Sequence, residues 1–140
     1  MKILETLFNR NSHKKDGLTQ TEREAIVDLL TLGVYADNHL SVAEDVAFET
    51  LTNKMNWESK RDISYYIYAA TERARQARSD EGAVEEFLNY VAERLQSPAA
   101  HSQALNLLNK LFSADGSNKK EGDFYKTVER ILKGGNSPKE

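Results

Sequence analysis

The sequence predicts an all-α protein that folds as a single-domain bundle of about seven helices. Its 140 residues include only two prolines and seven glycines, so few positions interrupt a helix. Apolar residues recur at spacings of three and four, the period of an amphipathic helix, and no segment alternates as a half-buried strand does. A chain of this length can bury a sizeable core in one domain without disulfides.

Seven segments carry this periodicity or a helix-start signal. They cover about residues 3–8, 24–36, 41–55, 59–78, 82–96, 97–114 and 119–132, and a polar tail follows at 134–140. The second segment is apolar almost all round, so we expect it to lie at the centre of the bundle.

Three of the predicted helices begin with a recognisable cap. Thr19 and Ser41 each stand three residues before a glutamate, the capping-box pattern, in which the two residues satisfy each other's backbone N–H groups. Ser97-Pro98 combines an N-cap residue with a proline at the first helical position, where the missing N–H costs nothing. These signals predict helix starts near residues 20, 42 and 98.

The helix predicted at 59–78 has two different faces. Small and aliphatic residues line one of them, whereas Tyr65 and Tyr68 fall on the opposite side beside Arg61 and Arg75. Tyrosine and arginine are enriched at protein interfaces. We therefore expect this second face to pack against a neighbour or to bind a partner protein, rather than RNA or DNA.

The composition argues against several classes of function. A net charge of −3 disfavours nucleic-acid binding, which usually needs a basic excess. No apolar run approaches the roughly 18 residues of a membrane span, and the absence of cysteine excludes thiol catalysis and thiolate metal sites. The stretch MKILETLFNRN has a glutamate in its apolar run and no small-residue cleavage site, so we expect a cytoplasmic protein without a secretory signal.

Two stretches of the chain repeat the same order of features. LLTLGVYADNHLSVAED at 29–45 and LLNKLFSADGSNKKEGD at 107–123 each contain an apolar helix, Ala-Asp, a turn and an acidic helix start. The repetition predicts a helix-turn-helix unit used twice, at about 19–57 and 97–133, with the two copies related by a pseudo-twofold axis.

The two aspartates of this pattern admit two interpretations. Asp37 and Asp115 end their helices at the negative pole of the helix dipole, which disfavours a carboxylate unless a donor or a cation compensates. Each could accept backbone N–H bonds within its own turn. Alternatively, each could join the first-turn glutamate of the next helix, Glu44 or Glu121, as an oxygen ligand of a hard divalent cation. His39 could join such a site, although a lone turn histidine is more often simply exposed.

The two stretches resemble the TerB-like family, the small helical domain of tellurite-resistance systems. This resemblance implies an internally pseudo-symmetric helical domain and association with other stress-response proteins. It also implies a divalent metal ion, calcium or magnesium rather than zinc, held by the acidic residues Asp37, Glu44, Asp115 and Glu121. The chain departs from the family pattern at Asn38, which replaces a glycine, and in its second turn, which is one residue shorter.

The sequence therefore leads to one main hypothesis and two alternatives. The main hypothesis is a non-enzymatic TerB-like module of a tellurite or chemical-stress response, which binds divalent metal and contacts partner proteins. The first alternative is a metal-free interaction scaffold in which the same acids only cap helices. The second is a carboxylate-dependent hydrolase, which the lack of a nucleophile elbow, a P-loop and an HExxH motif disfavours.

Overall fold

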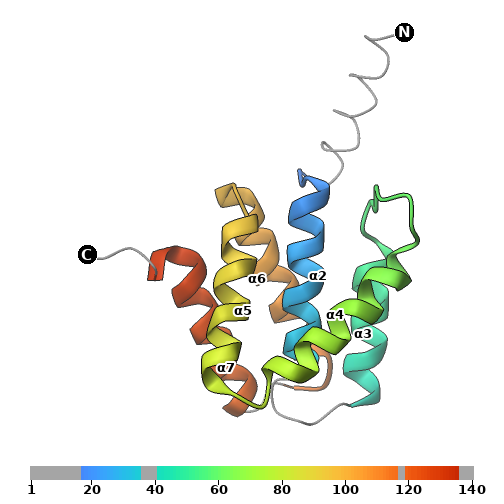
Figure 1. The fold of residues 1–140 in the computed structure, drawn as a ribbon. Helices are drawn as coiled ribbons and strands as arrows, with labels where there is room; N and C mark the ends of the chain where they lie inside the picture. The colour runs from blue at the N-terminus through green and yellow to red at the C-terminus, as the bar shows by residue number, and fades with distance from the viewer. Residues whose placement is uncertain (1–16, 36–40, 117–118, 136–140) are drawn as a thin grey trace, which may run out of the picture.

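Six α-helices make up most of the residues that the computed structural model describes, which are 17–35, 41–116 and 119–135 (Figure 1). The helices are α2 (Gln20–Val34), α3 (Val42–Asn53), α4 (Ile63–Ala77), α5 (Glu81–Arg94), α6 (Pro98–Phe112) and α7 (Lys119–Arg130). A 3₁₀ turn, η1 (Ser113–Asp115), follows α6, and a π-type turn, η2 (Ile131–Gly135), follows α7. These ranges contain no strand, so the all-α prediction is confirmed. The predicted segment at 3–8 lies outside the described residues.

Helix α2 lies at the centre of the bundle, as its apolar sequence predicts. Twelve of its 15 residues are buried, and it contacts α3, α4, α5 and α6, which surround it in Figure 1. One hydrophobic cluster joins Leu29 and Leu30 of α2 with Leu88 of α5 and Leu108 of α6. Burying one leucine side chain contributes about 1.5–3 kcal/mol, so this cluster is the main source of stability of the single compact domain.

Gly33 allows α2 and α6 to approach each other closely. A Cβ atom at this position would lie 2.9 Å from Cδ1 of Leu108 and 3.4 Å from Cζ of Phe112, both on α6. Carbon atoms in van der Waals contact are usually about 3.5–4.0 Å apart. The packing of the two helices therefore favours glycine here, since a larger residue would force Leu108 to shift.

The three predicted helix starts are confirmed. The Thr19 hydroxyl accepts a hydrogen bond from the Glu22 N–H (3.1 Å), and the Thr19 N–H donates to Glu22 Oε1 (3.0 Å), which completes the capping box. The Ser41 hydroxyl accepts from the Glu44 N–H (3.0 Å), and the Ser97 hydroxyl accepts from the Ala100 N–H (3.1 Å). Each bond satisfies one of the donors that a helix start leaves without an intrahelical partner.

Glu22 also ties the start of α2 to the connection between α5 and α6. Its Oε2 accepts hydrogen bonds from the backbone N–H of Gln96 (3.0 Å) and from the Ser97 hydroxyl (3.5 Å). The Glu22 side chain is buried, with 3% of its surface exposed. The carboxylate therefore serves two helix starts that lie far apart in the sequence.

Helix α4 begins at Ile63, four residues later than the predicted start at 59. The reason is Asp62, which acts as the N-cap because its carboxylate accepts a hydrogen bond from the Ser64 N–H (3.3 Å). The two predicted faces of this helix are confirmed: Ala70 and Ala74 are fully buried, whereas Tyr65 and Tyr68 are exposed. None of the described helices combines the length and the apolar composition needed to cross a membrane.

Candidate functional site

The two glutamates predicted as metal ligands are among the most deeply buried polar residues of the described chain. Glu44 lies in the first turn of α3 and Glu121 in the first turn of α7. Each is only 1% exposed. Glutamate is rarely fully buried unless its charge is compensated, as hydrogen bonds do for Glu22 in the first turn of α2, which is 3% exposed.

The two aspartates of the predicted site are less completely defined. Asp37 lies outside the described residues, as does His39. Asp115 ends η1, and the described structure covers its backbone but not its side chain. The next residue, Gly116, has φ = +82°, a conformation that favours glycine. Helix α3 packs against η1, so the helix that carries Glu44 contacts the turn that carries Asp115.

The described residues alone do not assemble a complete metal site. No group of three histidine, aspartate or glutamate side chains in these ranges lies close enough to hold one ion. The donor type nevertheless fits a hard cation, because carboxylate oxygens are what calcium and magnesium bind. We call the two Ala-Asp turns, with the helix starts that follow them, the acidic turns. A cation there would need the carboxylates of Asp37 and Asp115 in addition to Glu44 and Glu121.

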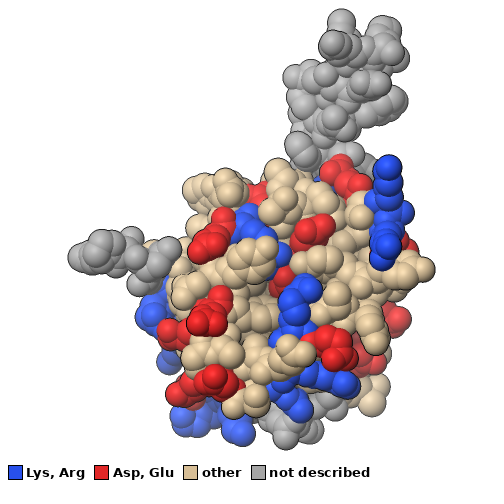
Figure 2. Space-filling view, in the orientation of Figure 1, with Lys and Arg blue, Asp and Glu red and all other residues tan. Residues whose placement is uncertain are grey.

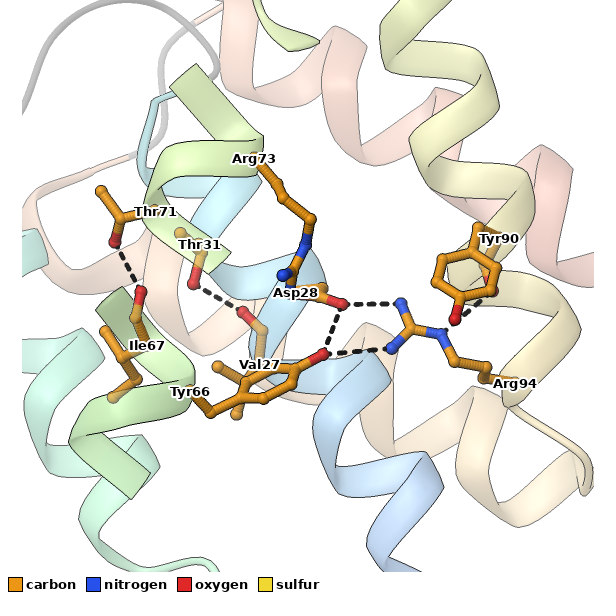
Figure 3. A network of polar contacts seen from close by, with 9 residues as sticks. All are labelled: Val27, Asp28, Thr31, Tyr66, Ile67, Thr71, Arg73, Tyr90 and Arg94. Atoms are coloured by element: carbon orange, nitrogen blue, oxygen red, sulfur yellow. Dashed lines mark hydrogen bonds and ion pairs between the residues drawn. The ribbon is translucent and has the colours of Figure 1, made fainter. Parts of the chain in front are cut away.

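A second polar site, which the sequence analysis did not predict, surrounds Asp28 on α2. Figure 3 shows Tyr66 and Arg73 of α4 and Arg94 of α5 converging on this carboxylate. Arg73 Nη2 lies 2.6 Å from Asp28 Oδ1, and Arg94 Nη2 lies 2.7 Å from Oδ2. The Tyr66 hydroxyl donates to Oδ2 (2.8 Å) and accepts from Arg94 Nη1 (3.2 Å). Only 2% of the Asp28 side chain is exposed.

Aromatic rings lie beside this network of Asp28, Tyr66, Arg73 and Arg94. The Arg94 guanidinium lies 4.0 Å from the centre of the Tyr90 ring, and that of Arg73 lies 5.3 Å from the centre of the Tyr66 ring. The centre of the Trp57 ring lies 5.5 Å from the centre of the Tyr66 ring. Cation–π contacts of this kind are worth about 0.5–2 kcal/mol, the upper values where water is excluded.

The Asp28 network connects helices α2, α4 and α5. The carboxylate uses both oxygens in bonds to two arginines and one tyrosine, so it is not available as a base or nucleophile in this arrangement. It links α2 to α4 on one side and to α5 on the other (Figure 3). The sequence did contain a signal for it, because a lone aspartate within the apolar run of α2 must be paired when that helix is buried.

The Tyr66 hydroxyl provides a pH-dependent test of this network. Burial raises the pKa of Tyr66 to about 12, and the negative charge of Asp28 adds to the increase. Unfolded tyrosines titrate near pH 10, so the folded state holds this proton more tightly. The stabilisation from the Tyr66 hydroxyl should be fully present below pH 10 and be lost as the pH rises toward 12.

The measurement compares urea midpoints of the wild type and Tyr66→Phe across this pH range. The wild type should be more stable than the variant below pH 10, and the difference should shrink above it. The other five tyrosines are common to both proteins and cancel. Two curves that stay parallel to pH 12 would show that the pKa of Tyr66 is not raised in the folded protein.

The histidines do not add to either site in the described part of the chain. His101 Nε2 donates to the Leu95 carbonyl (2.9 Å), which fixes its ring at the start of α6. His13 lies outside the described residues.

Comparisons of the chain with protein-family models, with curated proteins and with solved structures give no match in any of the three cases. The resemblance to the TerB-like family, the repeat and the pseudo-twofold axis therefore rest on the two sequence stretches and stay predictions.

Proposed function

We propose that this protein is a non-enzymatic, TerB-like helical module of a tellurite or chemical-stress response, which binds a divalent cation at its two acidic turns and contacts partner proteins. The observation that carries the proposal is the equal and nearly complete burial of Glu44 and Glu121. Both stand in the first turn of the helix that follows an Ala-Asp turn. Two matching positions with the same burial favour one shared role.

A cation offers a physical reason for this burial. Removing a carboxylate from water is costly unless hydrogen-bond donors or a positive charge replace the lost hydration. A divalent ion supplies that charge and takes several oxygen ligands at once, which suits a Glu from a first turn and an Asp from the preceding turn. The contact between α3 and η1 brings elements of the two predicted repeats together, so ligands from both could share an ion.

A metal-free interaction scaffold is the second candidate, and the cap at Ser41 favours it. The Ser41 hydroxyl accepts from the Glu44 N–H, as an ordinary N-cap does. In this alternative the first-turn glutamates only complete helix starts, and their negative charge interacts favourably with the positive pole of the helix. The function would then lie in the surfaces of the bundle.

Calorimetric titration with calcium, magnesium, manganese and zinc separates the two candidates. The wild type is compared with the double variant Asp37→Asn, Asp115→Asn, and melting is followed in parallel. The control is Asp45→Asn, Asp123→Asn, which removes the same charge from exposed positions on α3 and α7. A cation that binds only the folded state should raise the free energy of unfolding by about 2.7 kcal/mol at roughly 100 times its Kd.

We expect saturable binding of calcium or magnesium by the wild type and by the control, and none by the Asp37→Asn, Asp115→Asn variant. If no ion binds the wild type, or if both double variants lose binding equally, the metal proposal is wrong. If no ion binds and the Asp37→Asn, Asp115→Asn variant is only less stable than the wild type without metal, the result supports the capping role.

A further inference from the structure

A small pocket lies where the start of α4 meets α2 and the connection between α3 and α4, residues 54–62. Its volume is about 180 Å³. Three aromatic side chains line it, Trp57 from the connection and Tyr65 and Tyr66 from the first turn of α4. We refer to it as the aromatic pocket; its other lining residues are Glu24, Ser59, Arg61, Asp62 and Ala69.

Two of the three rings form a corner rather than a flat platform. The centres of the Trp57 and Tyr66 rings are 5.5 Å apart, and the ring planes are inclined by 54° to each other. Tyr65 adds a third ring, which is 62% exposed. Several aromatic rings around one small space are typical of sites that bind an organic cation, because each ring attracts positive charge to its face.

The rings of Trp57 and Tyr66 are held in place by neighbouring polar contacts. The Glu58 N–H donates to Gln20 Oε1 (2.9 Å), and Arg23 Nη1 lies 3.2 Å from Glu58 Oε1. These contacts fix the residue next to Trp57 against α2. The Tyr66 ring is fixed through its hydroxyl, which belongs to the network described above. A ligand therefore does not have to order these two rings when it binds, which reduces the cost of binding.

The charges around the aromatic pocket favour a cation over an anion. Glu24 and Asp62 are acidic and Arg61 is basic, so the described lining residues carry a net charge of −1 (two negative, one positive). The Arg61 guanidinium lies 5.5 Å over the Tyr65 ring, so this ring already attracts a cation of the chain itself. Arg61 is exposed and forms no ion pair with the described residues, so a ligand can displace its side chain.

The surroundings of the pocket carry charges of both signs. Figure 2 shows basic and acidic side chains close together at the upper right, where Figure 1 places the connection between α3 and α4. This edge of the molecule is therefore not a uniformly basic surface of the kind that attracts nucleic acid.

We propose that the aromatic pocket binds a small quaternary ammonium compound such as choline. The methyl groups of such a cation suit the apolar rings, and its charge needs no hydrogen-bond acceptor because the ring faces attract it. A primary ammonium is more strongly hydrated and loses more when it leaves water. Pockets for drug-sized ligands usually measure about 300–1,000 Å³, so the smaller volume here suits a single head group.

Trp57 is the only tryptophan of the chain, so its fluorescence reports on the aromatic pocket directly. The full chain is titrated with choline chloride to about 50 mM, well above a millimolar Kd, and sodium chloride keeps the ionic strength constant. We expect a saturable change with a Kd in the millimolar range. The neutral dimethylbutanol isostere, in which carbon replaces the nitrogen, should bind at least about tenfold more weakly, because it has the same shape without the charge.

Two tyrosines on α4 provide a matched pair of variants. Tyr65 and Tyr68 are both well exposed, at 62% and 73%, but only Tyr65 lines the aromatic pocket. Tyr65→Leu should weaken choline binding about fivefold, whereas Tyr68→Leu should leave it unchanged. Arg61→Gln should strengthen binding, because it removes the cation that competes for the Tyr65 ring. Circular dichroism verifies that each variant is folded, as expected for exposed positions.

Three results would overturn the proposal: no saturable change in the wild type, equal affinity for choline and the neutral isostere, or equal weakening by Tyr65→Leu and Tyr68→Leu. Free trimethyl-lysine presents the same head group on a longer chain. A lower Kd for it than for choline would support the pocket and identify a modified lysine as the source of the cation. All titrations contain a chelator, so this proposal and the metal proposal fail separately.

Discussion

Replacing Asp28 with alanine is expected to lower the free energy of unfolding by about 3–5 kcal/mol, a large share of the stability of a domain of this size. The variant leaves Arg94, whose side chain is only 12% exposed, and the Tyr66 hydroxyl without the carboxylate that both contact. A buried charge that loses its partner costs more than the pair itself contributed. Urea unfolding of the wild type and the variant at neutral pH measures the difference.

Asp123→Ala is the matched control for this prediction. Asp123 also forms an ion pair, with Lys119 Nζ at 3.2 Å, but both side chains are well exposed. Exposed pairs of this kind contribute less than about 1 kcal/mol. Equal losses of unfolding free energy in Asp28→Ala and Asp123→Ala would mean that the Asp28 network does not hold α2, α4 and α5 together as its burial indicates.

Shortening Leu108 to alanine is expected to destabilise the fold by about 2–5 kcal/mol, because it removes buried methyl groups and leaves a cavity between α2 and α6. Leu108 is fully buried and belongs to the central hydrophobic cluster. Leu107→Ala makes the same change at the neighbouring, partly exposed position and should cost clearly less. Thermal and urea unfolding of both variants would show whether burial decides the difference.

A substitution at Gly33 tests how tightly α2 and α6 pack. Gly33→Ala alone should destabilise the protein, since the new Cβ would lie 2.9 Å from Leu108 Cδ1. In the Leu108→Ala background that contact is absent, and alanine is a better helix former than glycine by about 1 kcal/mol. There the change should stabilise. If Gly33→Ala changes the free energy of unfolding in the same direction in both backgrounds, Leu108 does not determine the preference for glycine.

The fold could be predicted from the sequence because its strongest signals are local. The capping residues Thr19, Ser41 and Ser97 depend on neighbours three positions away, and all three bonds are present. The central position of α2 follows from the apolar residues that lie on almost all sides of this helix. The start of α4 was predicted four residues too early, because the apolar spacing alone did not identify Asp62 as the N-cap.

The candidate site was less predictable because its contacts are not local. Asp28 lies 45 residues from Arg73 and 66 from Arg94, so nothing in the neighbourhood of any one of them reveals the network. The acidic turns were predicted from repetition, which identified two glutamates that are both buried. Their ligand role depends on aspartates whose side chains the structure does not describe, and it stays a proposal.

The bond between Glu22 and the Gln96 backbone has a consequence for folding during synthesis. The two residues are 74 positions apart, so the start of α2 gains this contact only after α5 has been made. At about 5–20 residues per second, roughly 4–15 s pass between the synthesis of Glu22 and that of Gln96. For most of that interval α2, which has more buried residues than any other described helix, lacks α5 and α6, two of the four helices that contact it. Until α6 has emerged, the apolar surface of α2 that α5 and α6 cover in the folded protein has no native partner and is open to non-native contacts.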